Sequence, residues 1–390
     1  PELSRGLGDV YKRQEYILTT LNFMTHLIAK SARLRSTPYT KRIEEYGVQS
    51  YTVYNHMLLP ASFKGIEEDS RHLKNNVQLW DVSGERQVQI QGPDAAKLTQ
   101  LITCRDLSEA KDYLCYYAPI VDNKGKIIND PLIMKVGEKT WWLSIADTDV
   151  LLYAKGIAIG MNLDVEITEP NVNILAVQGP KSFELMSRVF KDIDKLKFFN
   201  FKRFDFQNHK FLIARSGWSK QGGFEIYVDH DEIGLDLYDT LMSKGEDLDV
   251  RPGCPNLIER IEGGLLSFGN DMNMNDTPLE CGLGSFVSFN PKIDYLGKAE
   301  LEKQHKEGVK RSLVGLKLKL DKIEITKALP LKIGTNIIGE LRAACFSPDF
   351  GCCLGIAMVQ TQYQSLEKKQ TLLVDGEEVE SVMTNLPFNK

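Results

Sequence analysis

The sequence predicts an α+β protein that ends in a small β-barrel or sandwich. Residues 87–91 alternate between polar and apolar side chains, which is typical of a strand with one buried face. Residues 95–102 and 233–244 place apolar side chains at helical spacing. After a charged helical segment at 298–310, the remaining chain reads as short β segments separated by turns, a pattern of small barrels and sandwiches.

The length of 390 residues allows two or three domains. Residues 1–23 show no clear periodicity, so we expect a non-native or disordered leader, with Met24 a plausible start. Residues 24–300 should form two related lobes, because a strand followed by Gln-Gly-Pro and a helix occurs at 91–93 and again at 178–180. Residues 301–390 should form the C-terminal β domain.

The first half of the chain is expected to mix short helices with short strands. Helices are predicted at 40–46, 65–73, 95–102 and 147–156, the third with Asp94 as its N-cap. Strands are predicted at 77–83, 87–91, 132–136, 140–145, 165–168 and 172–177. Asp122-Asn-Lys-Gly125 predicts a hairpin turn between the segments 116–121 and 127–128.

A glycine-bracketed loop at 214–223 carries Trp218 and leads into a short strand. Glu225 and Tyr227 should share one face of that strand, while Phe224, Ile226 and Val228 share the other. The functional interpretation is a carboxylate and a phenol presented beside an aromatic loop. The alternative is a hairpin with a solvated glutamate and a tryptophan that only packs on the loop.

The second half is expected to hold helices at 233–244, 258–266 and 298–310. A glycine-rich turn region lies at 277–284. The C-terminal β segments are predicted at 313–320, 331–333, 337–341, 355–359 and 370–374.

Bulk properties argue against several classes of function. The net charge of −5 offers no basic footprint for nucleic acid. No apolar run approaches the roughly 18 residues that span a membrane. The six histidines are scattered, so no metal is expected, and the known phosphate-loop, dinucleotide and zinc-protease motifs are missing. Seven cysteines without a Cys-x-x-Cys pair indicate reduced thiols and a cytoplasmic protein.

A series of motifs from about residue 51 to the C-terminus resembles the aminomethyltransferase family, the T-protein of glycine cleavage. The motifs are Leu79-Trp-Asp-Val-Ser83, Gly92-Pro-Asp-Ala95, the 117–130 hairpin, Ala176-Val-Gln-Gly-Pro180, Gly223-Phe-Glu-Ile226, Arg260-Ile-Glu-Gly-Gly264, Gly269-Asn-Asp271, Thr277-Pro-Leu-Glu280 and 347–355. Within the family, the loop from Arg215 to Tyr227 is most similar to that of dimethylsulfoniopropionate demethylases.

The resemblance implies three lobes around a central channel that holds tetrahydrofolate. The position of Glu225 contacts the pterin in the family, where a carboxylate can accept two N–H bonds from an aminopyrimidine edge. Arg260 falls near the folate, although a pair with the neighbouring glutamates is the alternative. Tyr117 falls on a tyrosine that lines the site, and its neighbour Tyr116 should face the other side of the strand.

Two departures from the family distinguish this chain. The family's paired acids read Asn129-Asp130, and its asparagine in the next strand falls on Ile145, beside Ser144. An amine leaving group must be managed by an acid, whereas a sulfonium leaves as a neutral thioether and needs no proton. The departures therefore suit a sulfonium donor.

Aromatic faces attract a cation, so Trp218 and Tyr227 are predicted as catalytic and substrate-binding residues. Asp130 is the third catalytic candidate, and Tyr117 and Ser144 are further substrate contacts. The substrate carboxylate could be held by Lys220, Arg215 or backbone N–H groups, and the sequence leaves this choice open.

The resemblance thus predicts a tetrahydrofolate-dependent demethylase of dimethylsulfoniopropionate that yields methylmercaptopropionate and 5-methyltetrahydrofolate. The alternatives are an aminomethyltransferase, a demethylase of a methylated amine such as glycine betaine, and a non-catalytic folate-binding module. A monomer or a homodimer is expected, without nucleic-acid or membrane partners.

Overall fold

The computed structural model describes Ile28 and residues 31–389. The chain divides into two units, Pro1–Arg35 and Ser36–Lys390, and the following description concerns the second. The predicted leader at 1–23 lies outside the described residues.

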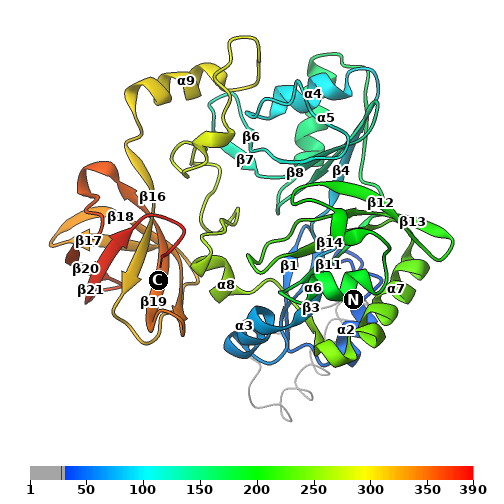
Figure 1. The fold of residues 1–390 in the computed structure, drawn as a ribbon. Helices are drawn as coiled ribbons and strands as arrows, with labels where there is room; N and C mark the ends of the chain where they lie inside the picture. The colour runs from blue at the N-terminus through cyan, green and yellow to red at the C-terminus, as the bar shows by residue number, and fades with distance from the viewer. Residues whose placement is uncertain (1–27, 29–30, 390) are drawn as a thin grey trace, which may run out of the picture. The chain divides into compact units, whose positions relative to one another are not determined.

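A six-stranded sheet forms one layer of this unit (Figure 1). Its strand order is β12-β13-β14-β11-β3-β15, and only the β15–β3 pair is parallel. The strands are β3 (Val77–Asp81), β11 (Asn173–Gln178), β12 (Phe201–Phe206), β13 (His209–Ala214), β14 (Gly223–Val228) and β15 (Val250–Gly253). Helices α2 (Thr40–Glu45), α6 (Ser182–Ser187) and α7 (Asp231–Lys244) share a hydrophobic core with one of its faces.

A five-stranded sheet in the order β10-β4-β9-β8-β5 forms a second layer. Its strands are β4 (Gln87–Gln91), β5 (Cys115–Tyr117), β8 (Leu132–Gly137), β9 (Thr140–Ser144) and β10 (Glu166–Thr168). Helices α4 (Ala95–Ile102) and α5 (Val150–Gly160) pack on one face around a separate core. The two sheets meet through their other faces, where Trp80 and Tyr227 of the first sheet cluster with Trp142 of the second.

Smaller elements connect these layers. They are β1 (Ser50–Tyr54), β2 (Met57–Ser62), α3 (Ile66–Asn75), β6 (Ile120–Val121), β7 (Ile127–Asn129), α8 (Leu257–Glu262) and α9 (Lys298–Glu307). Single 3-10 turns occur at Ile193–Lys195, Glu246–Leu248, Gly284–Phe286 and Thr361–Tyr363. The predicted turn at Asp122-Asn-Lys-Gly125 does join an antiparallel pair, β6 and β7.

The C-terminal strands close into a barrel in the order β16-β19-β18-β17-β20-β21. They are β16 (Arg311–Leu318), β17 (Leu329–Ile333), β18 (Asn336–Ser347), β19 (Cys352–Gln360), β20 (Lys369–Val374) and β21 (Glu377–Thr384). The predicted α+β class is confirmed, and the choice between barrel and sandwich falls on the barrel. β21 was absent from the sequence prediction, and its pairing with β16 is what closes the ring.

The two Gln-Gly-Pro turns have the same backbone geometry. Gly92 and Gly179 adopt φ values of 136° and 121°, and a Cβ would lie 2.6 Å and 2.3 Å from the carbonyl oxygens of Asp164 and Asn76. Only glycine fits such a close approach of two backbones. Each turn leads into a helix, α4 or α6, so the repeat seen in the sequence is a repeat in local structure. The predicted lobe boundaries stay predictions.

Three local predictions were wrong in detail. Asp94 occupies the N-cap position of α4 without bonding the helix; its carboxylate accepts the backbone N–H of Asp164 at 2.9 Å instead. Helix α5 begins at Val150 rather than 147, because Thr148 bonds to Ile128 and Asn129. Helix α8 ends at Glu262, where Gly264 turns to a φ of 60°.

Candidate functional site

Strand β14 lies in the interior of the six-stranded sheet and divides its side chains between two cores. Phe224, Ile226 and Val228 pack on the helical side, and Tyr227 packs on the side of the second sheet. The predicted alternation is therefore confirmed. Glu225 shares the face of Tyr227 and is only 8% exposed, which excludes the alternative of a solvated glutamate.

The Trp218 loop is tied to this strand. The Ser216 hydroxyl donates a hydrogen bond to the Glu225 carboxylate. Burial raises the pKa of Glu225, and the Ser216 hydroxyl opposes that shift. Gln178 of β11 holds the loop through two hydrogen bonds: it donates to the Ser216 carbonyl at 3.3 Å and accepts from the Ser219 hydroxyl at 2.7 Å.

Glycine is required at the loop's entry. Gly217 has a φ of 153°, and a Cβ there would lie 2.2 Å from the amide of Gln178. Trp218 follows it and is half-buried. Gln221 closes the loop by donating to Glu259 of α8 at 2.6 Å.

Two further acids are grouped with Glu225, because the charges of Glu225 and Asp130 both act on Glu85. Asp130 lies between β7 and β8, and Glu85 lies in the turn between β3 and β4. Burial first, then the charges of Glu225 and Asp130, raise the pKa of Glu85 well above its usual range. We call these three residues the acid cluster.

Asp130 is positioned by Tyr117, whose hydroxyl donates to Oδ2 at 2.9 Å. Burial raises the pKa of Asp130 to about 7. Its other oxygen, Oδ1, is buried and has no hydrogen-bond partner among the described residues. One oxygen is therefore fixed and the other is available to a ligand.

Tyr227 carries another buried polar atom. The residue is 1% exposed, and its hydroxyl forms no hydrogen bond of normal geometry in the part of the chain that the structure describes. Burial, then the charges of Glu225, Cys115 and Glu85, raise its pKa well above the usual value. A hydrogen bond from the Ser144 side chain opposes this rise, so Ser144 is a polar neighbour of the Tyr227 hydroxyl.

Ser144 and Gln87 face the same space from the second sheet. They are paired across β9 and β4, and Gln87 Nε2 donates to the Ser144 hydroxyl at 3.0 Å. The Gln87 Oε1 atom is buried without a partner in the described chain.

The two neighbouring tyrosines of β5 separate as predicted. Tyr117 packs edge-on against Phe286, with ring centroids 5.0 Å apart, while Tyr116 packs on the core of the second sheet.

The departure at Asn129 has a structural explanation. Its side chain is fully buried and bonds Ala146 through both amide atoms and the Thr148 hydroxyl through Nδ2. A carboxylate there could not donate these bonds. Ile145 packs in the core of the second sheet.

Arg260 is engaged in a way that neither interpretation anticipated. It forms a buried ion pair with Asp271 at 2.7 Å. Its helical neighbours have other partners, since Glu259 accepts from Gln221 and Glu262 pairs with Lys74 at 2.6 Å. The charge of Asp271 in turn raises the pKa of Asp130. Arg260 is therefore linked to the acid cluster through Asp271 and does not belong to it. A folate contact of Arg260 stays a prediction.

The aromatic cage also stays a prediction. The ring partner of Tyr227 in the described chain is Trp142, with centroids 6.1 Å apart. Among the carboxylate donors, Arg215 is turned to the helical side, where its guanidinium lies 4.4 Å from the Phe183 ring centroid. Lys220 is exposed on the loop.

The structure therefore brings together Tyr117, Asp130, Ser144, Glu225 and Tyr227 from the predicted set. The prediction missed Glu85, Ser216 and Tyr54, a half-buried tyrosine whose pKa is raised by burial and then by Glu85 and Asp130. One signal was present: Glu85 lies in the short polar turn between two predicted strands, 77–83 and 87–91.

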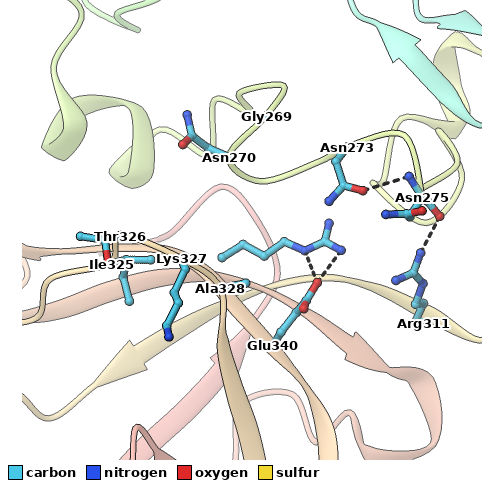
Figure 2. Close-up of a pocket in the computed structure, with 11 residues that line it drawn as sticks. Gly269, Asn270, Asn273, Asn275, Arg311, Ile325, Thr326, Lys327, Ala328 and Glu340 are labelled. Atoms are coloured by element: carbon cyan, nitrogen blue, oxygen red, sulfur yellow. Dashed lines mark hydrogen bonds and ion pairs between the residues drawn. The ribbon is translucent and has the colours of Figure 1, made fainter. Parts of the chain in front are cut away.

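A separate polar cavity of about 350 Å³ lies beside the barrel (Figure 2). Arg311 and Arg342 line it together with Glu340 and Asn275. Asp276 pairs with both arginines, at 2.8 Å and 2.6 Å, so the cavity's buried cations are already neutralised. Its link to the site is indirect, through the bond from Arg342 to the Asp271 carbonyl at 2.8 Å.

Two further features of the described residues concern membranes and metal ions. None of the helices within Ile28 and 31–389 has the length and apolar character needed to cross a membrane. In the same residues, His, Cys, Asp and Glu side chains form no group of three or more that could hold a metal ion.

Comparisons with known proteins agree with this arrangement. Residues 39–291 match the family model of the GCVT N-terminal domain. Residues 311–390 match that of the glycine cleavage T-protein C-terminal barrel domain.

Individual relatives cover nearly the whole chain. The chain is 48% identical over 337 residues to a dimethylsulfoniopropionate demethylase DmdA from Ruegeria pomeroyi, covering 86% of this chain and 92% of that protein. It is 32% identical to an aminomethyltransferase from Clostridium botulinum, covering 91% and 97%. The aminomethyltransferase T structure from Bartonella henselae superposes with a TM-score of 0.81 at 21% identity, over 91% of this chain and 98% of that one, and so shares the fold.

Proposed function

The chain belongs to the glycine cleavage T-protein family of aminomethyltransferases, and on this premise we propose that it is a tetrahydrofolate-dependent demethylase of dimethylsulfoniopropionate. The products would be methylmercaptopropionate and 5-methyltetrahydrofolate. The observation that carries the proposal is the 48% identity to a dimethylsulfoniopropionate demethylase over most of both chains. The acid cluster supports it, because a bound cation would offset the burial that raises the pKa of these acids.

The residues present fit a bound tetrahydrofolate, which supplies the nucleophilic N5 that accepts the methyl group. Glu225 is a buried carboxylate that shares one oxygen with Ser216 and can accept N–H bonds from an aminopyrimidine edge. Asp130 Oδ1 is the kind of buried polar atom that a polar ligand satisfies.

The protein's contribution to methyl transfer is mostly positioning, which can supply several kcal/mol. The donor's carbon–sulfur bond breaks with its electron pair left on sulfur, so the leaving group needs no acid. The amine that receives the methyl group must lose a proton. Asp130 Oδ1 can take that proton, because a carboxyl with a pKa of about 7 exchanges protons readily near neutral pH.

The remaining predicted residues have assigned roles in this proposal. Trp218 and Tyr227 would hold the sulfonium through their aromatic faces, worth about 0.5–2 kcal/mol each. Tyr117 and Ser144 would line the donor pocket, and Arg260 would act near the folate through its pair with Asp271.

The direct test incubates the pure protein with dimethylsulfoniopropionate and tetrahydrofolate. Formation of 5-methyltetrahydrofolate and methylmercaptopropionate in equal amounts is the expected result. If folate binds and neither product forms, the proposed reaction is wrong.

A second candidate is favoured by Asp130, which keeps one of the family's acids. An aminomethyltransferase or a methylated-amine demethylase would depend on this carboxylate to manage the amine. Full methyl transfer by an Asp130→Asn protein would argue against this candidate, and also against the proton-accepting role given to Asp130 in the first proposal. Folate binding without turnover of sulfonium, betaine or glycine-derived donors would instead favour a non-catalytic folate-binding module.

We further infer a cytoplasmic protein that is a monomer or homodimer. The support for the compartment is that all seven cysteines are free thiols, which suits a reducing environment. Sedimentation at several protein concentrations would separate the two oligomeric states.

A further inference from the structure

We propose that Gln221 and Glu259 are positioning residues for the methyl donor, because the hydrogen bond between them holds the Trp218 loop against helix α8. The inference rests on the proposed function, since both residues act on the donor through Trp218. We call the bond from Gln221 to Glu259 the loop tether.

Helix α8 is anchored at both ends, so it gives the tether a fixed base. At its start, the Asn256 side chain caps the first turn and donates to the Ile66 carbonyl at 2.8 Å. At its end, Glu262 pairs with Lys74 of α3 at 2.6 Å. Apolar side chains of α8 share a core with the barrel (Figure 1). A side chain on this helix can therefore hold a neighbouring loop in place.

Glu259 directs its carboxylate to the loop. The residue is only 3% exposed, and its Oε1 accepts from Gln221 Nε2 at 2.6 Å. Its Oε2 has no hydrogen-bond partner in the described chain, since Lys74 Nζ lies 3.9 Å away. A buried carboxyl group without a donor is costly. The Gln221 amide satisfies this group, so the tether stabilises both of its ends.

The loop needs a restraint close to Trp218. Lys220 has a φ of 59°, a left-handed conformation that is unfavourable for residues other than glycine. The loop approaches α8 closely at this point, because a Cβ on Gly263 would lie 3.0 Å from Cγ of Lys220. The tether starts from the next residue, Gln221, and holds this turn against the helix.

The tether differs from the other hydrogen bonds of the loop in the element that it reaches. In the described chain, residues 216–222 otherwise bond within the loop or with Gln178, Gly179 and Glu225, which lie in or beside the six-stranded sheet. Among these described contacts, the tether is the one that links the loop to α8. Loss of the tether should therefore release the loop from α8 and leave its bonds to the sheet intact.

The consequence should be confined to the donor. Trp218 would hold the sulfonium by the face of its ring, and a cation–π contact depends on where that face lies. Because charge leaves sulfur in the transition state, a displaced ring should weaken donor binding more than it slows methyl transfer. The tether should therefore affect the donor KM and leave kcat and the affinity for tetrahydrofolate unchanged.

The kinetic test compares Gln221→Leu with a matched control, Gln362→Leu, which makes the same change at an exposed glutamine of the barrel. Gln221→Leu should raise the KM for dimethylsulfoniopropionate about tenfold, as for a lost hydrogen bond to a carboxylate, while the control keeps the wild-type value. In the exchanged pair Gln221→Glu/Glu259→Gln, the helix donates and the loop accepts. This double variant should restore a donor KM near that of the wild type.

A second measurement needs no donor. The chain has four tryptophans, of which Trp80, Trp141 and Trp142 are buried and Trp218 is half-buried. Acrylamide quenching of the fluorescence that is lost in Trp218→Phe therefore reports the exposure of Trp218. Gln221→Leu should increase this quenching, and the exchanged pair should return it to the wild-type value.

Three results would overturn the inference. The first is a Gln221→Leu protein that keeps either the donor KM or the quenching of the wild type. The second is an exchanged pair that stays as impaired as Gln221→Leu, because the hydrogen bond would then not be the cause. The third is a parallel rise in the donor KM and the dissociation constant of tetrahydrofolate, which indicates general damage to α8. If Gln221→Leu fails to fold, Gln221→Ala replaces it under the same criteria.

The outcome can be separated from that of the proposed function. If the wild type forms no 5-methyltetrahydrofolate from dimethylsulfoniopropionate, the proposed function fails. The quenching measurement then decides the inference alone. Exposure of Trp218 in Gln221→Leu that the exchanged pair reverses supports the tether, and unchanged exposure refutes it.

Discussion

Two buried groups of acids in this protein are built in opposite ways. Beside the barrel, Asp271, Asp276 and Glu280 are each paired with an arginine, at 2.7 Å, 2.6 Å and 3.1 Å. Between the sheets, Glu85, Asp130 and Glu225 have no described cation beside them and accept only from hydroxyl groups. The first group is neutralised by arginines, whereas burial raises the pKa of all three acids of the second.

The largest expected effect tests the neutralised group. Asp271→Ala leaves Arg260 buried without its partner, since Arg260 is 5% exposed and Asp271 is fully buried. We expect a loss of about 3–5 kcal/mol in the free energy of unfolding, measured by urea denaturation. A loss below about 1 kcal/mol would show that solvent reaches the arginine and that the pair is not structural.

The same kind of change in the acid cluster should affect binding and spare stability. Glu225→Gln removes a buried charge that has no cation beside it, so unfolding should be unchanged or harder. Tetrahydrofolate should bind about 10–100-fold more weakly, because a charge-assisted contact is lost. Calorimetry compares Glu225→Gln with Glu138→Gln, which changes an exposed glutamate in the β8–β9 hairpin. Loss of stability without loss of binding would refute the distinction.

A smaller effect concerns pH. The pKa of Asp130 is raised to about 7 in the folded protein, above the value of an unfolded aspartate. The folded state therefore holds a proton that the unfolded chain releases, and this contribution to stability is lost as pH rises toward 7.

The free energy of unfolding of the wild type, measured between pH 5 and 8, should thus decline relative to Asp130→Asn, by roughly 1.4 kcal/mol per unit of pKa shift. Parallel pH profiles for the two proteins would show that Asp130 titrates normally.

The smallest effect lies in the loop. Trp218→Ala removes one aromatic face and should raise the donor KM by about 2–30-fold, from a cation–π contact of about 0.5–2 kcal/mol. Folate affinity and stability should stay unchanged, as they should for Ile159→Ala, which changes a side chain that is 82% exposed. If donor kinetics do not change, Trp218 only packs on the loop.

The sequence could predict what local pattern controls. The alternation in β14 follows from the two-residue period of a strand, and it correctly separates Glu225 and Tyr227 from Phe224 and Ile226. Tyr117 and Tyr116 were separated by the same rule. The predicted site roles of Trp218 and Arg260 rested on the family resemblance, which identifies positions but not the contacts that they make.

What the sequence could not predict depends on distant parts of the chain meeting. Glu85, Asp130 and Glu225 come from three separate segments, and nothing local to Glu85 shows that two other acids lie near it. The partner of Arg260 is Asp271 beyond the end of its helix, so the intrahelical alternative was plausible and still incorrect. Strand β21 was missed because its exposed positions are acidic, although Asp375-Gly376 is a hairpin signal that joins it to β20.

The support of the Trp218 loop has a consequence for engineering the protein. Gln178 forms hydrogen bonds with residues on either side of Trp218, namely the Ser216 carbonyl and the Ser219 hydroxyl. It belongs to β11, an interior strand of the six-stranded sheet. These two bonds hold the backbone of the loop on either side of Trp218. The side chain at position 218 can therefore be varied on a supported backbone. Libraries of substitutions there can be screened for new methyl donors without redesigning the scaffold.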